Sequence, residues 1–106
     1  MNRARVVVLY AHPLFGEGIA KLLAKDQRLD VHCGPARRQD VIQKAAELRP
    51  DALILEGYAE VDRLVEDLPP IPVTFVDMRD AELVAYRDRH LVQPAPQTLD
   101  EAILPR

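Results

Sequence analysis

Apolar residues occur along the chain in two alternating patterns. Short runs without polar alternation, such as Ala-Leu-Ile-Leu at 52–55, indicate strands that are buried on both faces of a sheet. Apolar residues spaced by three and four positions, as between residues 15 and 23, indicate the buried face of a helix. The strands predicted on this basis cover residues 5–10, 29–33, 52–55, 73–76 and 90–92.

The segments between these strands carry helix signals. Pro13 suits the first position of a helix, Asp40 can cap one, and Pro69-Pro70 ends one. The predicted helices begin at residues 13 and 40, and further ones cover residues 61–68, 81–87 and 99–104, the last capped by Thr98. Five such alternations without a linker predict a single α/β domain over residues 1–106, with a parallel sheet and helices on both faces.

Composition narrows the classes of protein that fit. The chain has 106 residues, 48% of them hydrophobic and 29% charged, as expected for a globular domain. A net charge of −3 argues against direct nucleic-acid binding, and no apolar segment approaches the length of a membrane span. The single cysteine, Cys33, excludes an internal disulfide and favours a cytoplasmic protein; in its predicted strand it should be a small buried residue.

Glu56 is the first candidate site residue, because it follows the most apolar strand. Ligands of open α/β sheets bind outside the carboxyl ends of the strands. Glu56, Asp77 and His12 could meet there as a metal site, although His12 is also well placed simply to begin a helix. No glycine-rich loop follows the first strand, and Cys33 has no base on its own face of the strand. We therefore expect neither a cofactor nor an enzyme.

Several motifs resemble bacterial response-regulator receiver domains, especially those attached to helix-turn-helix output domains. Residues 10–18 read Tyr-Ala-His-Pro-Leu-Phe-Gly-Glu-Gly, where those domains read Asp-Asp-His-Pro-Leu-Phe-Arg-Glu-Gly. Arg49-Pro50-Asp51 before an apolar strand and an acid, Ile71-Pro72-Val73, and Pro94 complete the similarity. The resemblance implies a flavodoxin-like, doubly wound sheet of five parallel strands in the order 2-1-3-4-5.

The chain departs from this family at every position of the phosphorylation machinery. By resemblance, the magnesium-binding acids fall on Tyr10 and Ala11, which offer no suitable oxygen ligands, and the phosphorylated aspartate falls on Glu56. The switch hydroxyl falls on Asp77 and the lysine before proline falls on Gln93. Together these substitutions indicate a pseudo-receiver with a degenerate phosphoacceptor pocket.

The function expected from the sequence is a phosphorylation-independent signalling or regulatory module that binds another protein or itself. The alternative is a small α/β domain that uses the altered strand-end pocket to bind a metal or another ligand. A homodimer is expected because the last helix is too short to cover the sheet face beside the first helix. The predicted interface consists of apolar residues near both ends of the chain, namely Leu14, Phe15, Leu99, Ile103 and Leu104.

Overall fold

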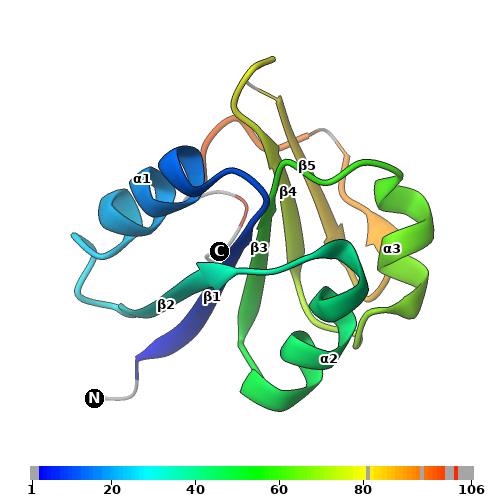
Figure 1. The fold of residues 1–106 in the computed structure, drawn as a ribbon, viewed down its shortest axis with the longest axis horizontal. Coiled ribbons are helices and arrows are strands. Elements are labelled where there is room, and N and C mark those ends of the chain that lie inside the picture. The colour runs from blue at the N-terminus through cyan, green and yellow to red at the C-terminus, as the bar shows by residue number, and fades with distance from the viewer. Residues whose placement is uncertain (1–2, 81, 94, 100–101, 103–106) are drawn as a thin grey trace.

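A computed structural model of the chain describes residues 3–80, 82–93, 95–99 and 102. The described elements are six strands and three helices (Figure 1). In chain order they are β1 (Ala4–Tyr10), α1 (Pro13–Leu23), β2 (Leu29–Pro35), α2 (Arg38–Leu48), β3 (Ala52–Glu56), α3 (Val61–Asp67), β4 (Val73–Asp77), β5 (Glu82–Arg87) and β6 (His90–Leu91).

The strands form one mixed sheet in the order β2-β1-β3-β4-β5-β6. Strands β1 to β4 pair in parallel, whereas β5 is antiparallel to β4 and β6 is antiparallel to β5. The α/β class and the order of the first four strands are confirmed. The prediction of a purely parallel, five-stranded sheet is wrong.

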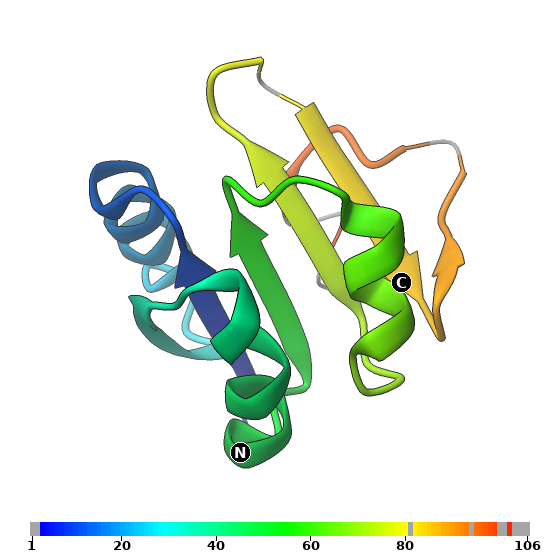
Figure 2. The ribbon, with the colours of Figure 1, turned by 45° about the vertical axis from the view of Figure 1, so that its right-hand side comes forward.

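Alternation along the central strands divides the core between the two faces of the sheet. Helices α2 and α3 lie side by side on one face, where they cover Val7, Leu9, Leu53 and Leu55 (Figure 2). On the other face, α1 contributes Ile19, Ala20 and Leu23, which pack with Val6, Val8 and Ile54; Leu99 and Ala102 belong to the same cluster. The buried strand predicted at residues 52–55 is confirmed, since every residue of β3 is buried.

The Arg49-Pro50-Asp51 turn explains how α2 is joined to β3. Arg49 caps α2 in the left-handed region, with φ 46° and ψ 58°, and Pro50 cannot continue the helix. Asp51 then binds the start of β1 twice. Its N–H donates to Arg5 O at 2.8 Å, and its Oδ2 accepts the Arg5 N–H at 2.7 Å.

The helix predicted over residues 81–87 is wrong, because this segment forms β5. Leu83 and Ala85 face the α1 side of the sheet while Val84 and Tyr86 face the α3 side, so both faces are used as in a strand. The turn that follows has φ 51° at Asp88 and φ 67° at Arg89, as a two-residue hairpin turn requires. The predicted fifth strand is therefore β6, the antiparallel partner of β5.

Other expectations concern single residues and the end of the chain. Cys33 is exposed on β2, so the prediction that it is a buried hydrophobe is wrong. Of the predicted last helix, Leu99 and Ala102 are helical, and Ala102 N–H donates to Thr98 O at 3.2 Å; Ile103 and Leu104 lie outside the described residues. Among the helices of the described ranges, none is long and apolar enough to cross a membrane.

Candidate functional site: the carboxyl ends of β1 and β3

The carboxyl ends of β1 and β3 meet in register, with Tyr10 opposite Glu56. The Ala11 N–H continues this pairing by donating to the Glu56 carbonyl oxygen at 2.9 Å. Beyond this point α1 starts at Pro13, with His12 as its N-cap residue. Three residues of the predicted pocket, Tyr10, Ala11 and Glu56, thus lie together.

The Glu56 side chain is buried, with only 2% of its surface exposed, and both carboxylate oxygens have partners. Oε1 accepts the backbone N–H of His12 at 2.8 Å, and Oε2 lies 3.0 Å from Nδ1 of the His12 ring. An ionised carboxylate only accepts hydrogen bonds, so Nδ1 is the donor when Glu56 is ionised. His12 begins the helix as expected, but it also contacts Glu56, so the alternative that it serves only to begin the helix is wrong. The carboxylate caps the entrance to α1 and satisfies its own buried charge there.

Gly57 is required for this arrangement. Its φ of 80° lies in the region that favours glycine, and a Cβ built on it would lie 2.5 Å from His12 Nδ1. The imidazole ring therefore occupies the space that a side chain at position 57 would fill. The signal in the sequence was an acid followed directly by glycine at the end of a buried strand.

Tyr10 and Gly16 form a second coupled pair. The Tyr10 side chain is buried against α1, and a Cβ at position 16 would collide with its Cβ and ring. The phenolic oxygen lies 3.5 Å from Glu17 Oε1, and burial, followed by the charge of Glu17, raises the pKa of Tyr10. Where the receiver motif has aspartate and arginine, this chain has tyrosine and glycine. The Tyr10 ring thus fills the space that a side chain at position 16 would occupy.

Asp77 does not join Glu56. Alternation places Glu56 on the α1 side of the sheet and Asp77 on the α3 side, since Ile54 and Phe75 occupy those two faces. The Asp77 carboxylate instead accepts the N–H of Arg79 at 2.9 Å and of Asp80 at 3.4 Å, and these bonds lower its pKa. Within the described residues, no three His, Cys, Asp or Glu side chains are grouped to hold a metal ion.

Gln93 lies far from Glu56. It follows β6, and the order of the sheet puts β4 and β5 between β3 and β6. Three strand spacings amount to about 14 Å. Gln93 lines a different cavity, of about 450 Å³, together with Val61, Tyr86 and Leu91. The structure therefore does not bring the predicted position of the family's lysine to the strand-end pocket.

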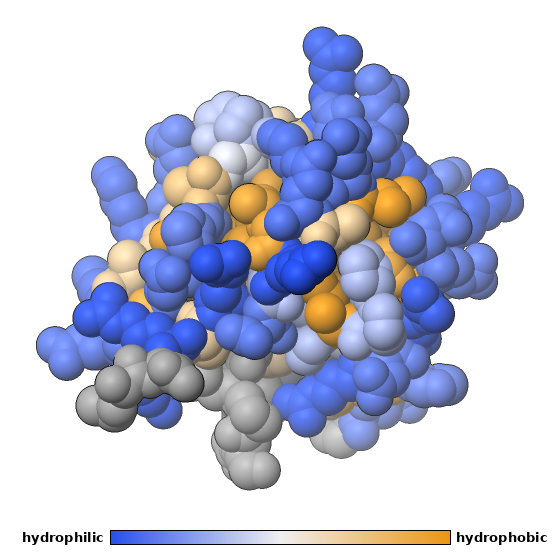
Figure 3. Space-filling model, turned by 90° about the horizontal axis from the view of Figure 1, so that it is seen from below, coloured by the Kyte–Doolittle hydropathy of each residue, from blue (hydrophilic) through white to orange (hydrophobic). Residues whose placement is uncertain are grey.

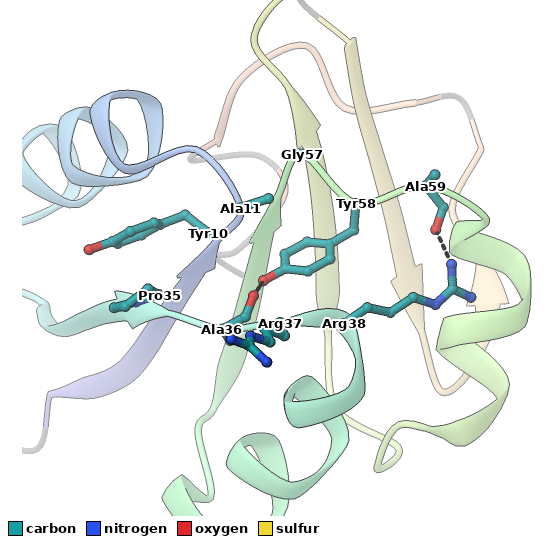
Figure 4. Close-up of a pocket in the computed structure, with 9 residues that line it drawn as sticks. All are labelled: Tyr10, Ala11, Pro35, Ala36, Arg37, Arg38, Gly57, Tyr58 and Ala59. Carbon is teal, nitrogen blue, oxygen red and sulfur yellow. Dashed lines mark hydrogen bonds between the residues drawn. The ribbon is translucent and has the colours of Figure 1, made fainter.

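A larger cavity, of about 630 Å³, opens beside the Glu56 pair over the ends of β2, β1 and β3. Figure 4 shows its lining, which includes Tyr10, Arg37, Arg38 and Tyr58. The Tyr58 side chain extends across the cavity, and its hydroxyl donates to Ala36 O. Burial, followed by the nearby carboxylates of Glu56 and Asp40, raises the pKa of Tyr58 to about 12. The sequence gives no signal for this cavity, because the consecutive arginines and Tyr58 match no motif.

Arg37 and Arg38 differ in how they line this cavity. Arg38 Nη1 donates to Ala59 O at 2.9 Å and lies 3.2 Å from a Glu60 carboxylate oxygen. Arg37 is the N-cap residue of α2 and is exposed. The cavity thus has one arginine held by its neighbours and a second that reaches solvent, next to the positive end of a helix dipole.

The residues of the predicted interface have different environments. Leu14 is 82% exposed at the start of α1. Phe15 is half-buried, and its ring meets the edge of the His12 ring at a centroid distance of 6.0 Å. Leu99 is also half-buried and packs against the α1 cluster, so it helps to cover the sheet face that the prediction left open.

Comparison of the chain with protein-family models and with curated proteins gave no match.

Proposed function

We propose that this chain is a phosphorylation-independent signalling or regulatory module, related in design to receiver domains, that acts in the cytoplasm by binding proteins. The observation that carries the proposal is the buried Glu56 carboxylate, whose two oxygens both bind His12. A carboxylate that accepts a phosphoryl group must present a free oxygen in line with the leaving group. The Glu56 side chain is only 2% exposed and His12 contacts both oxygens, so neither oxygen can meet a phosphoryl donor in line unless the start of α1 moves.

The surroundings of Glu56 support the same conclusion. Magnesium needs hard oxygen ligands, and Tyr10 turns its phenol toward Glu17 while Ala11 has no polar atom. Asp77 faces the other side of the sheet, so it supplies neither a hydroxyl nor a metal ligand at Glu56. Each group that phosphoryl transfer needs is thus replaced by one that fills space or bonds to the backbone.

Without phosphoryl transfer, the activity of such a module comes from its surfaces. In place of a fourth helix the chain has the β5–β6 hairpin, so the surface beyond β4 differs from that of a receiver domain. Figure 3 shows that the end of the molecule seen from below in Figure 1 is mainly polar, with apolar residues in separate patches. We therefore place partner binding at the sheet edges or around Leu14, and expect a homodimer.

The experiment that tests the proposal is incubation of the chain with acetyl phosphate and magnesium, followed by intact-mass measurement. The expected result is no added phosphoryl group, because the Glu56 carboxylate is buried and both its oxygens contact His12. A Glu56→Gln variant serves as the matched control, since it keeps an oxygen to accept the His12 N–H but cannot be phosphorylated. A stoichiometric phosphorylated species in the wild type that is absent from this variant would contradict the proposal.

The cavity beside Arg37 favours a second candidate function, the binding of a small anionic ligand. It lies at the ends of β1 and β3, where the order of the strands in the sheet reverses, and ligands of doubly wound sheets bind at such a point. Inorganic phosphate and divalent metal ions, tested separately, would raise the melting temperature if they bound only the folded chain. A phosphate-dependent rise that disappears in Arg37→Ala would favour this function. A rise with metal alone would instead favour a metal site.

A further inference from the structure

Strand β2 forms one outer edge of the sheet in the described part of the chain. It covers Leu29–Pro35, and β1 is its only neighbour among the described strands (Figure 1). The opposite edge strand, β6, has only two residues. Proteins commonly keep edge strands short or protect them, because their free main-chain groups can pair with another chain. By this criterion β2 is the edge that is open to pairing.

The hydrogen bonds to β1 fix which groups of β2 face outward. Ala4 N–H donates to Arg28 O at 3.0 Å, and Ala36 N–H donates to Tyr10 O at 3.3 Å. In a parallel pair this alternation directs the even-numbered residues of β2 toward β1. The N–H and C=O groups of Val31 and Cys33, and the C=O of Leu29, therefore point away from the sheet.

Other contacts limit the length of this outward row. At one end Leu29 N–H donates to Asp26 O at 3.1 Å, and at the other Lys44 Nζ donates to Pro35 O at 2.8 Å. The open segment is thus short and centred on Val31 and Cys33. A short segment allows few registers with a second strand.

Charge distinguishes among these registers. Asp30 and His32 are on the same face of β2, with Asp30 Oδ2 3.0 Å from His32 Nε2 and about half of each side chain exposed. A two-fold axis at Val31 would place Asp30 opposite His32 of the second copy, and His32 opposite its Asp30. An axis at Cys33 would place His32 opposite Gly34. An axis at Asp30 or at His32 would place that residue opposite its own copy and would leave the other of the two without a complementary partner. Only the register centred on Val31 is self-complementary.

We infer that two copies of this chain associate by antiparallel pairing of their β2 edges, with Val31 opposite Val31 of the second copy. The reciprocal main-chain bonds join these two residues, and Cys33 N–H donates to Leu29 O of the second copy on each side. The pairing joins two six-stranded sheets into one continuous sheet. This inference rests on the proposed role as an interaction module and names the surface that role uses.

The test is the molar mass of the full chain in solution, measured by light scattering at tens of micromolar. The wild type is expected to be a dimer. Val31→Pro removes an N–H that points outward, a position where an edge strand tolerates proline, and it is expected to be a monomer with an unchanged circular dichroism spectrum. A wild-type monomer would overturn the inference, as would a Val31→Pro dimer.

Charge variants test the register without relying on proline. His32→Asp places aspartates opposite each other and is expected to weaken association about tenfold. The exchanged pair, Asp30→His with His32→Asp, restores complementarity and should restore association. If the exchanged pair stays as weak as the single variant, the register is wrong.

Oxidation provides a second readout of register. In the inferred register Cys33 lies opposite Leu29, so the two Cys33 residues are too far apart to form a disulfide. Rapid formation of a Cys33–Cys33 disulfide would overturn the register. The outcome of these tests is separate from that of the acetyl phosphate experiment. An unphosphorylated monomer would overturn the β2 pairing and the expected homodimer but not the phosphorylation-independent role, whereas a phosphorylated dimer would overturn that role and not the pairing.

Discussion

The carboxyl ends of β1 and β3 and the β5–β6 hairpin differ in different ways from the receiver domains that the sequence resembles. At the strand ends the backbone follows the expected course, and it is side chains that differ from the motif: Glu56 and Gly57 fit around His12, and Tyr10 fits against Gly16. At the hairpin the backbone itself differs, because a strand stands where a helix is expected. Agreement in the backbone therefore does not require agreement in the site, and the backbone differs in a segment that carries none of the strand-end residues.

The largest expected effect tests whether the two regions differ in their contribution to stability. Leu53 on β3 is fully buried, whereas Leu91 on β6 is 49% exposed. Leu53→Ala should lower the free energy of unfolding by roughly 2–5 kcal/mol because it leaves a cavity in the core. Leu91→Ala, the matched control, should cost less than about 1 kcal/mol. Denaturant unfolding measures both, and equal losses would mean that the hairpin is as integral as the parallel strands.

The parallel strands could be predicted from the sequence because their signals were strong and independent. The run at residues 52–55 is apolar throughout, and Arg49-Pro50-Asp51 combines a helix stop with a carboxylate that binds β1. Local propensity, pattern and turn chemistry agreed, and such agreement makes a prediction reliable. The structure confirms the α/β class and the order of these strands.

The hairpin was missed because its signals are short and ambiguous. The helix over residues 81–87 was predicted from Leu83 and Val84, but two adjacent apolar residues do not make a helical face. The segment instead alternates as a strand with both faces covered: Leu83 and Ala85 share one face, and Val84 and Tyr86 share the other. Asp88 and Arg89 have positive φ angles, but neither is glycine, the residue whose presence would have predicted this turn.

The site could be predicted only in part, because contacts between side chains depend on tertiary structure. The resemblance to receiver domains predicted a shared pocket for Tyr10, Ala11 and Glu56, and the register of β1 with β3 brings their backbones together. The pairing of Glu56 with His12 required the longer glutamate side chain to reach back to α1, which no sequence period encodes. Asp77 and Gln93 were misplaced for different reasons, the first by alternation across the sheet and the second by the inserted strand β5.

The next effect tests whether the strand-end contacts act as a unit. Gly57→Ala should destabilise the chain by roughly 1–3 kcal/mol, since φ is 80° and the new Cβ would press on His12. In a His12→Ala background the steric part of this cost should disappear. A double-mutant cycle from chemical denaturation measures the coupling between the two positions. If the two losses of stability simply add, the His12 ring does not depend on the missing side chain at Gly57, and the two residues are not a coupled pair.

The smallest expected effect is on tyrosine ionisation. Alkaline titration compares the pKa of one tyrosine from each region. Burial raises the pKa of Tyr58, beside the strand ends, and of Tyr86, on β5, to about 12 from the ordinary value of 10.0. The Tyr86 hydroxyl also donates to the Asp62 carboxylate, which would repel a tyrosinate. Above about pH 10 the unfolded chain binds fewer protons than the folded chain. The stability associated with these protons is complete below that pH and is lost as the pH rises toward 12.

Substitutions separate the two tyrosines. Asp62→Asn removes the charge beside Tyr86 but does not touch Tyr58, so it should lower the Tyr86 pKa and leave the Tyr58 pKa in place. Ultraviolet absorbance of tyrosinate in Tyr58→Phe and Tyr86→Phe backgrounds assigns each transition. Tyr86→Phe removes one hydrogen bond, worth on the order of 1 kcal/mol, and should flatten the fall in stability between about pH 10 and 12. An Asp62→Asn titration identical to the wild type would show that burial alone holds the Tyr86 proton. Tyr86 would then differ from Tyr58 at the strand ends, where the charges of Glu56 and Asp40 add to the effect of burial.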